Sequence, residues 1–147
     1  MEGKCLDDNI VYEGNVTNHT DNVTRPYVGL TSVPWKERYA VHKQGITHRH
    51  YSSGCELTKH IWELKDSNKT FSIHWKILEH VRGKLIGGEC KLCVAEKLHI
   101  ITHPKRDMLL NTNIMVKCRH KAKQMLLSIL GPRGGRPPKN IPSETVT

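Results

Sequence analysis

Apolar and polar side chains alternate along three segments of the chain, and this pattern predicts three β-strands. The first segment spans residues 10–16, and the second spans residues 27–30, where Pro26 takes a position that an edge strand tolerates. Residues 17–25 between them are polar and are predicted to form a loop, so the two strands should pair as an antiparallel hairpin. Residues 71–77 alternate without interruption and are predicted to form a half-buried third strand.

Helical signals separate and follow these strands. Thr31 or Ser32 ahead of Pro34 is typical of a hydroxyl-capped start, so we expect a helix from Pro34 to Gln44, ended by Gly45. A loop over 83–88 and three further helices are expected, the helices at Glu56–Leu64, Cys90–Ile101 and Asn113–Leu130. The expected fold class is therefore α+β, a small three-stranded antiparallel sheet flanked by helices.

Length and composition divide the chain into one folded domain and its extensions. The 147 residues are enough for a single hydrophobic core. We expect an N-terminal extension (1–9), a folded domain (10–112), a basic helix (113–130) and a tail (131–147). The tail is rich in Pro and Gly and is predicted to be disordered and basic.

The net charge of +9 favours a polyanionic partner, with nucleic acid ahead of an anionic membrane. Charge alone fits a merely basic protein equally well. No run of about 18 apolar residues is present, so no membrane span is expected. The N-terminus lacks the layout of a signal peptide, and five cysteines suit reduced thiols or metal binding better than a disulfide framework. We expect an intracellular, nuclear protein.

The spacing of four side chains suggests a shared site. In the first strand Tyr12 faces the same way as Ile10, and Tyr27 can lie on that face across the hairpin. Arg38 and His42 are four residues apart and therefore share one stripe of their helix. If this helix packs on the hairpin, two phenols, a guanidinium and an imidazole converge. Each residue alone is more often a packing or solvated residue, and only the ordered set is informative.

These residues resemble the motifs of the GIY-YIG nuclease family. Its two tripeptides correspond to Ile10-Val11-Tyr12 and Tyr27-Val28-Gly29, although Ile10 stands where the first tripeptide normally has glycine. The family's helix arginine, histidine, catalytic glutamate and late asparagine correspond to Arg38, His42, Glu96 and Asn111. The chain is most similar to the GIY-YIG domains of Penelope-like and related animal retroelements, in the segments Tyr27–Thr31, Glu56–Trp62 and Cys90–Lys97.

The resemblance implies a DNA endonuclease that hydrolyses phosphodiester bonds with one divalent cation, Mg²⁺ or Mn²⁺, and no small-molecule cofactor. Glu96 would bind the cation, and Arg38 would stabilise charge on the phosphate. Tyr12 would accept the proton of the attacking water, which requires Arg38 and the metal to lower its pKa from about 10. Tyr27 would position that water, while His42 would orient Tyr12 or share the proton. Asn111 would be a supporting hydrogen-bond donor.

Three other glutamates compete for the metal, and Glu96 is preferred because its helix follows the last strand, as the family pattern requires; the competitors are Glu56, Glu63 and Glu79. A second metal is suggested by Cys90 and Cys93, which have the spacing of a zinc half-site. Such a structural zinc needs two more ligands, for which Cys118, His120 and Cys5 are candidates and Cys55 is less persuasive. Buried thiols at the start of a helix are the alternative.

The C-terminal residues add basic character. Pro132–Lys139 resembles an AT-hook with one glycine too many, and a generic basic tail is the simpler interpretation. Two rivals to an active endonuclease remain open. One is a catalytically inactive, zinc-stabilised module that binds nucleic acid through the same surface. The other is a zinc-stabilised interaction module whose tyrosines only pack the core.

Overall fold

The computed structural model describes residues 3–52, 55–83, 85–86 and 89–111, which form an α+β fold. One antiparallel sheet has the strand order β2-β1-β3, with bounds β1 (Ile10–Asn18), β2 (Val23–Thr31) and β3 (Phe71–His80). The helices are α1 (Trp35–Thr47), α2 (Glu56–Asp66) and α3 (Lys91–Ile101). Two short 3-10 turns follow, η1 (Arg49–Tyr51) after α1 and η2 (Arg106–Met108) after α3. The predicted fold class is confirmed.

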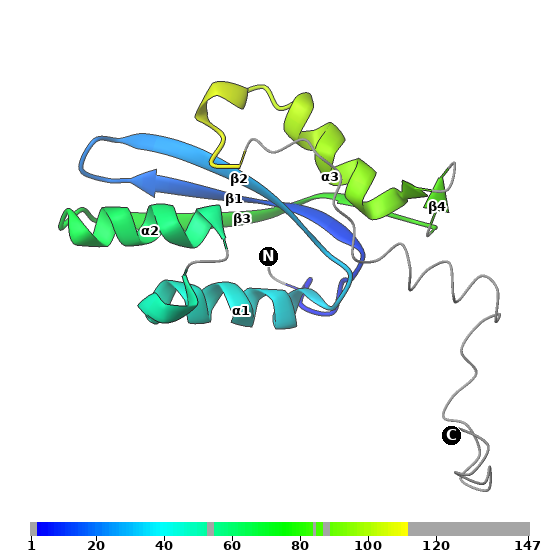
Figure 1. The fold of residues 1–147 in the computed structure, drawn as a ribbon, viewed down its shortest axis with the longest axis horizontal. Coiled ribbons are helices and arrows are strands. Elements are labelled where there is room, and N and C mark those ends of the chain that lie inside the picture. The colour runs from blue at the N-terminus through cyan, green and yellow to red at the C-terminus, as the bar shows by residue number, and fades with distance from the viewer. Residues whose placement is uncertain (1–2, 53–54, 84, 87–88, 112–147) are drawn as a thin grey trace, which may run out of the picture.

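The sheet forms a middle layer, with α1 and α2 on one face and α3 on the other (Figure 1). The alternation of β1 decides which side chain meets which helix. Ile10 and Tyr12 pack in the core shared with α1 and α2, whereas Val11 packs in the core shared with α3. The facing predicted for these strand residues is therefore confirmed, and it sends the phenol of Tyr12 toward α1.

The hairpin is longer than predicted, and the loop predicted over residues 17–25 is wrong at both ends. Thr17 and Thr24 are strand residues whose hydroxyls lie 2.9 Å apart across the hairpin. The turn is held by Asn18, whose side-chain oxygen accepts from the N–H of Thr20 at 2.9 Å. The segment was predicted as a loop because it is polar, but its polar side chains form hydrogen bonds with one another across the two strands. Pro26 does lie in an edge strand, as predicted.

Two expectations about α1 are corrected. Gly45 does not end the helix, because its role is a close helix contact: a Cβ there would lie 2.7 Å from Cγ2 of Thr58 on α2. No side-chain hydroxyl caps the first turn of α1. Instead, the N–H groups of Trp35 and Lys36 each donate at 2.8 Å to backbone carbonyls of the N-terminal extension, those of Asp7 and Cys5. These bonds satisfy groups that a helix start leaves without partners.

The remaining elements follow the sequence pattern with small shifts at their ends. The loop predicted over 83–88 contains β4 (Leu85–Ile86), which pairs with β5 (Glu89–Cys90). None of the helices in the described ranges is long and apolar enough to cross a membrane. The predicted basic helix (113–130) and tail (131–147), with their proposed zinc ligands, lie outside the described residues.

Candidate active site

The hydroxyl of Tyr12 is the centre of a buried polar cluster. Its Oη lies 2.6 Å from Nε2 of His42 and accepts a hydrogen bond from Nε of Arg38 at 3.0 Å. Tyr12 comes from the first half of β1, and the other two residues come from one stripe of α1. Tyr12 and His42 are 0% and 2% exposed, so this contact is inside the core. The predicted stripe of α1 therefore meets the predicted phenol of the sheet.

Burial sets the protonation of this cluster. It raises the pKa of Tyr12 to about 12, although the charge of Arg38 acts in the opposite direction. Burial and then Arg38 lower the pKa of His42 to about 3, so the imidazole is neutral at pH 7. Because Arg38 already donates to Oη, the buried O–H of Tyr12 is satisfied by donating to Nε2 of His42. Arg38 alone therefore does not lower the pKa of Tyr12 below its usual value.

The free energy of unfolding is expected to fall as the pH is lowered from about 6.5 toward 3, because the unfolded chain protonates His42 and the folded chain does not. The loss approaches 1.4 kcal/mol per pH unit, in order of magnitude, well below the unfolded pKa. Urea unfolding between pH 7 and 5 measures the slope, which should decrease in His42→Gln. His74→Gln is the control, because His74 is an exposed histidine of β3 that lies outside the cluster. An unchanged slope in His42→Gln would contradict this assignment.

The second phenol, Tyr27, lies beside the first across the hairpin. The two ring centroids are 6.5 Å apart, and burial raises the pKa of Tyr27 well above its usual value. Gly29 makes room for both rings, since a Cβ at this position would lie 2.6 Å from Cζ of Tyr12 and 2.9 Å from Cε1 of Tyr27. The glycine of the Tyr27-Val28-Gly29 motif is therefore required by close ring packing on β2.

Cys55 is a contact of Tyr27 that the sequence did not reveal. Its thiol, at the start of α2, packs against the core that contains Tyr27 and contributes to the raised pKa of that phenol. From the sequence, Cys55 was only a less persuasive candidate for a zinc ligand. No signal in the sequence connects it with Tyr27, because the contact depends on how α2 packs against β2.

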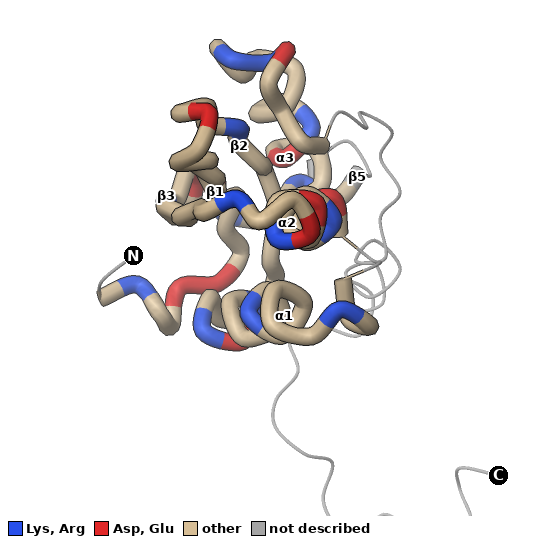
Figure 2. The backbone as a smooth tube through the Cα atoms, turned by 90° about the vertical axis from the view of Figure 1, so that its left-hand side faces the viewer, with Lys and Arg blue, Asp and Glu red and all other residues tan. Residues whose placement is uncertain are grey.

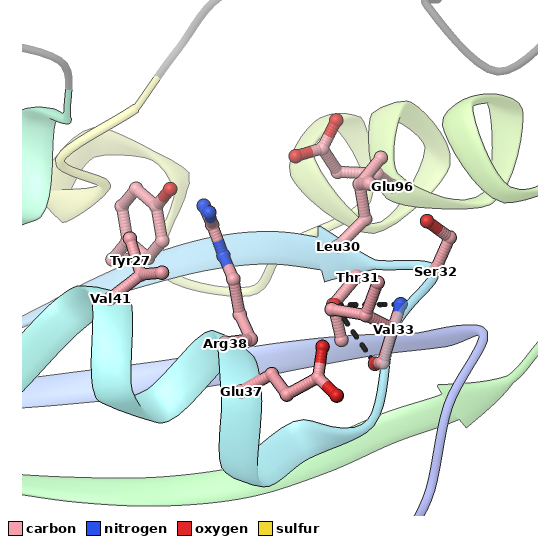
Figure 3. A pocket seen from close by; sticks show the side chains of 9 residues that line it. All are labelled: Tyr27, Leu30, Thr31, Ser32, Val33, Glu37, Arg38, Val41 and Glu96. Atoms are coloured by element: carbon pink, nitrogen blue, oxygen red, sulfur yellow. Dashed lines mark hydrogen bonds between the residues drawn. The ribbon is translucent and has the colours of Figure 1, made fainter.

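An open pocket of about 420 Å³ lies at the edge of the sheet beside β2, between α1 and α3. It brings Tyr27, Arg38 and Glu96 together from three different elements (Figure 3). The guanidinium of Arg38 rises from α1 between Tyr27 and the carboxylate of Glu96. Tyr12 and His42 do not line the pocket, and they lie behind Arg38. A phosphate in this pocket would meet the guanidinium first.

The side chain of Glu96 is only 14% exposed, and its Oε2 lies 3.0 Å from Nζ of Lys97. Three further polar residues of the pocket, Thr31, Ser32 and Glu37, were not predicted to line it. Glu37 had a usable signal, because it precedes Arg38 and is four residues before Val41, which also lines the pocket. Ser32 had none, since it lies in the short connection between β2 and α1.

Asn111 lies outside the pocket and supports the sheet. Its Oδ1 accepts from the N–H of Val28 at 3.0 Å, and its Nδ2 donates to the carbonyl of Val28. The N–H of Leu110 donates to the carbonyl of Pro26 at 2.8 Å. The segment after η2 therefore runs along the outer edge of β2, next to Tyr27. Asn111 is a hydrogen-bond donor to the backbone of the strand that carries Tyr27, and it has no direct access to a bound phosphate.

The rival glutamates are placed away from this pocket. Glu56 pairs with Lys59 at 3.2 Å, Glu63 lies 3.8 Å from His60, and Glu79 lies 3.0 Å from His99. Of the four glutamates considered for the catalytic cation, only Glu96 lines the pocket with Arg38.

The structure does not bring Cys5 to the Cys90–Cys93 pair. Cys90 and Cys93 are buried at the start of α3, whereas Cys5 is exposed beside the first turn of α1, on the other face of the sheet. In the described part of the chain, no three His, Cys, Asp or Glu side chains gather as a metal site. Cys118 and His120 lie outside that part, so the structural zinc stays a prediction.

Comparison with known proteins adds no relative: no protein-family model, curated protein or solved structure matches the chain. The interpretation of the site therefore depends on its geometry and on the motif resemblance alone.

Proposed function

We propose that this chain is a DNA endonuclease that hydrolyses phosphodiester bonds with one divalent cation. The observation that carries the proposal is the position of Arg38. Its Nε is held by the hydroxyl of Tyr12, while its guanidinium lines the same pocket as Glu96 and Tyr27. A guanidinium beside a carboxylate in a pocket at a sheet edge suits a phosphodiester and a cation together.

Arg38 would bind the scissile phosphate and stabilise the negative charge that builds up on its oxygens. The side chain is prepared for this, because its hydrogen bond to Tyr12 fixes its direction. Figure 2 shows that Lys and Arg predominate among the charges of α1, whereas α2 carries both signs. The helix that presents Arg38 therefore attracts a polyanion.

Glu96 would hold the cation, because it is a carboxylate in the pocket and Mg²⁺ commonly uses one or two carboxylates, with water and substrate oxygens completing its shell. Such a cation would polarise the phosphate and stabilise the leaving oxygen. The donor set of the pocket fits it. Lys97 would release Oε2 of Glu96 to make this possible.

Tyr27 faces the pocket and would position the attacking water, while Tyr12 and His42 would take up its proton. As the water oxygen attacks phosphorus and the bond to the leaving oxygen breaks, Tyr12 would accept the proton and pass its own to Nε2 of His42. The charge of Arg38 contributes to the low pKa of His42, so an anionic phosphate on Arg38 would raise that pKa and favour the transfer. This route requires Arg38 to uncover Oη of Tyr12 as it binds the phosphate.

We also propose a retroelement origin and a nuclear location, both supported by the motif resemblance to Penelope-like elements and by the net charge of +9. The proposed endonuclease is tested with supercoiled plasmid and the full chain. Nicking is expected with Mg²⁺ or Mn²⁺ and should stop in excess EDTA. Plasmid and gapped DNA that both stay intact with every divalent cation would overturn the proposal of an active nuclease.

The complete burial of Tyr12 favours a second candidate, an inactive module that binds nucleic acid through the same pocket. A phenol with a pKa raised to about 12 behind Arg38 is a support for the guanidinium and a poor base. This candidate would show a salt-dependent shift of DNA in a gel and no Mg²⁺-dependent nicking. Bound zinc in protein purified without chelator would support its zinc-stabilised form.

A further inference from the structure

Three exposed rings form a cluster where α1 ends, outside the pocket. The rings of His50 and Tyr51 have centroids 4.0 Å apart, and the ring of His48 lies 6.0 Å from His50 and 6.2 Å from Tyr51. Tyr51 is 53% exposed, and both histidines are exposed. Neither hydrophobic core includes any of these rings. We call His48, His50 and Tyr51 the ring cluster.

Contacts with α1 and α2 hold the backbone of the ring cluster in place. Arg49, within the same short segment, forms a two-pronged ion pair with Asp66, and its guanidinium lies 4.7 Å from the ring centroid of Trp62. The indole N–H of Trp62 donates to the carbonyl of Gly45 at 2.8 Å, and Thr58 donates to the carbonyl of Ser52 at 2.7 Å. These contacts tie η1 to α2. Exposed rings on a fixed backbone lose little conformational entropy when they bind a flat partner.

The ring cluster also continues the pocket along α1. Val41 lines the pocket, and α1 ends at Thr47, six residues and about 9 Å further along the helix axis, so the ring cluster begins just beyond that end. Three nucleotides of a stacked strand span about that length, at about 3.4 Å each. A DNA strand whose phosphate lies on Arg38 therefore reaches the ring cluster within a few nucleotides.

We propose that the ring cluster is a stacking platform for unpaired bases of a DNA substrate. Ring faces bind base faces without regard to sequence, and those faces are open only where bases are unpaired. The proposal rests on the proposed endonuclease and narrows its substrate class to DNA with single-stranded nucleotides next to the scissile bond, such as gaps, flaps and branched junctions. The net charge of +9 favours a nucleic acid over a protein as the partner of these rings.

The test measures binding without cleavage. Fluorescence anisotropy with the full chain in EDTA compares a labelled single-stranded 12-mer with the matching duplex. Tyr51→Ala is expected to weaken single-strand binding about tenfold and to change duplex binding less than twofold. Tyr51→Phe should retain wild-type binding, whereas Tyr51→Leu, which keeps an apolar side chain without a ring, should behave as Tyr51→Ala does. Tyr39→Ala is the matched control, since Tyr39 is a 41% exposed tyrosine of α1 that does not line the pocket.

The outcomes separate this inference from the proposed function. Unchanged single-strand binding in both Tyr51→Ala and Tyr51→Leu would overturn the platform, as would an equal loss with duplex. If either result is found together with wild-type nicking of plasmid, the platform fails and the proposed endonuclease still holds. The expected binding pattern with no cleavage of plasmid or of a gapped duplex under any divalent cation would support a platform on a binding module and overturn the nuclease alone.

Discussion

Replacing Glu96 by glutamine is expected to lower Mg²⁺-dependent nicking of supercoiled plasmid by about a thousandfold. Among the glutamates considered for the cation, Glu96 is the one that shares the pocket with Arg38. The amide keeps the shape of the side chain and removes the charge that binds a divalent cation. The loss corresponds to about 4 kcal/mol of transition-state stabilisation, in the range expected for a cation that neutralises a developing charge.

Two controls distinguish loss of the cation from loss of folding or of DNA binding. Glu79→Gln removes a glutamate that pairs with His99 outside the pocket, so it should nick at the wild-type rate. DNA binding by Glu96→Gln in EDTA should match or exceed that of the wild type, because a negative charge has left the site. Wild-type nicking by Glu96→Gln would remove Glu96 from the mechanism.

Replacing Arg38 by alanine is expected to reduce nicking by a factor of 10² to 10³ or more, because the phosphate loses its fixed cationic donor. Arg38→Lys should recover little of the rate, since an ammonium offers no planar fork and cannot reproduce the bond from Nε to Tyr12. The quantity to measure is the single-turnover rate with saturating enzyme, which separates chemistry from binding.

Arg38 also leaves a signature that does not depend on cleavage. Its charge contributes to the low pKa of His42, so Arg38→Ala should raise that pKa, and NMR titration of the imidazole reports it directly. Lys36→Ala is the matched control, because Lys36 is a basic residue of the same helix that does not line the pocket. An unchanged pKa of His42 together with undiminished nicking in Arg38→Ala would contradict the proposed site.

Local periodicity was enough to predict the inner half of the site. The two-residue repeat of β1 places Tyr12 toward α1, and the four-residue spacing of Arg38 and His42 places both on the stripe that meets it. The hairpin pairing then brings Tyr27 to the same face. Each of these placements needs only the geometry of one element or of two adjacent strands, whereas the packing of α1 on this face of the hairpin was a condition that the structure supplies.

The outer half depends on packing between elements that are distant in the sequence. Glu96 reaches the pocket from α3, on the other face of the sheet, and only the motif resemblance singled it out. Nothing in the local pattern shows that Arg38 separates Tyr12 from the pocket, or that Cys55 contacts Tyr27. The carbonyls that accept from the first turn of α1 could not be predicted from the sequence either, because backbone groups carry no residue-specific signal.

The pairing of Asn111 and Leu110 with β2 has a consequence for self-association. These bonds occupy backbone groups on the outer side of the strand that flanks the pocket, and so hinder any further strand from docking there. Within the described residues, the opposite border of the sheet is β3, which has one neighbouring strand. Chains that joined by extending their sheets would therefore meet through β3, and each would keep its pocket facing outward.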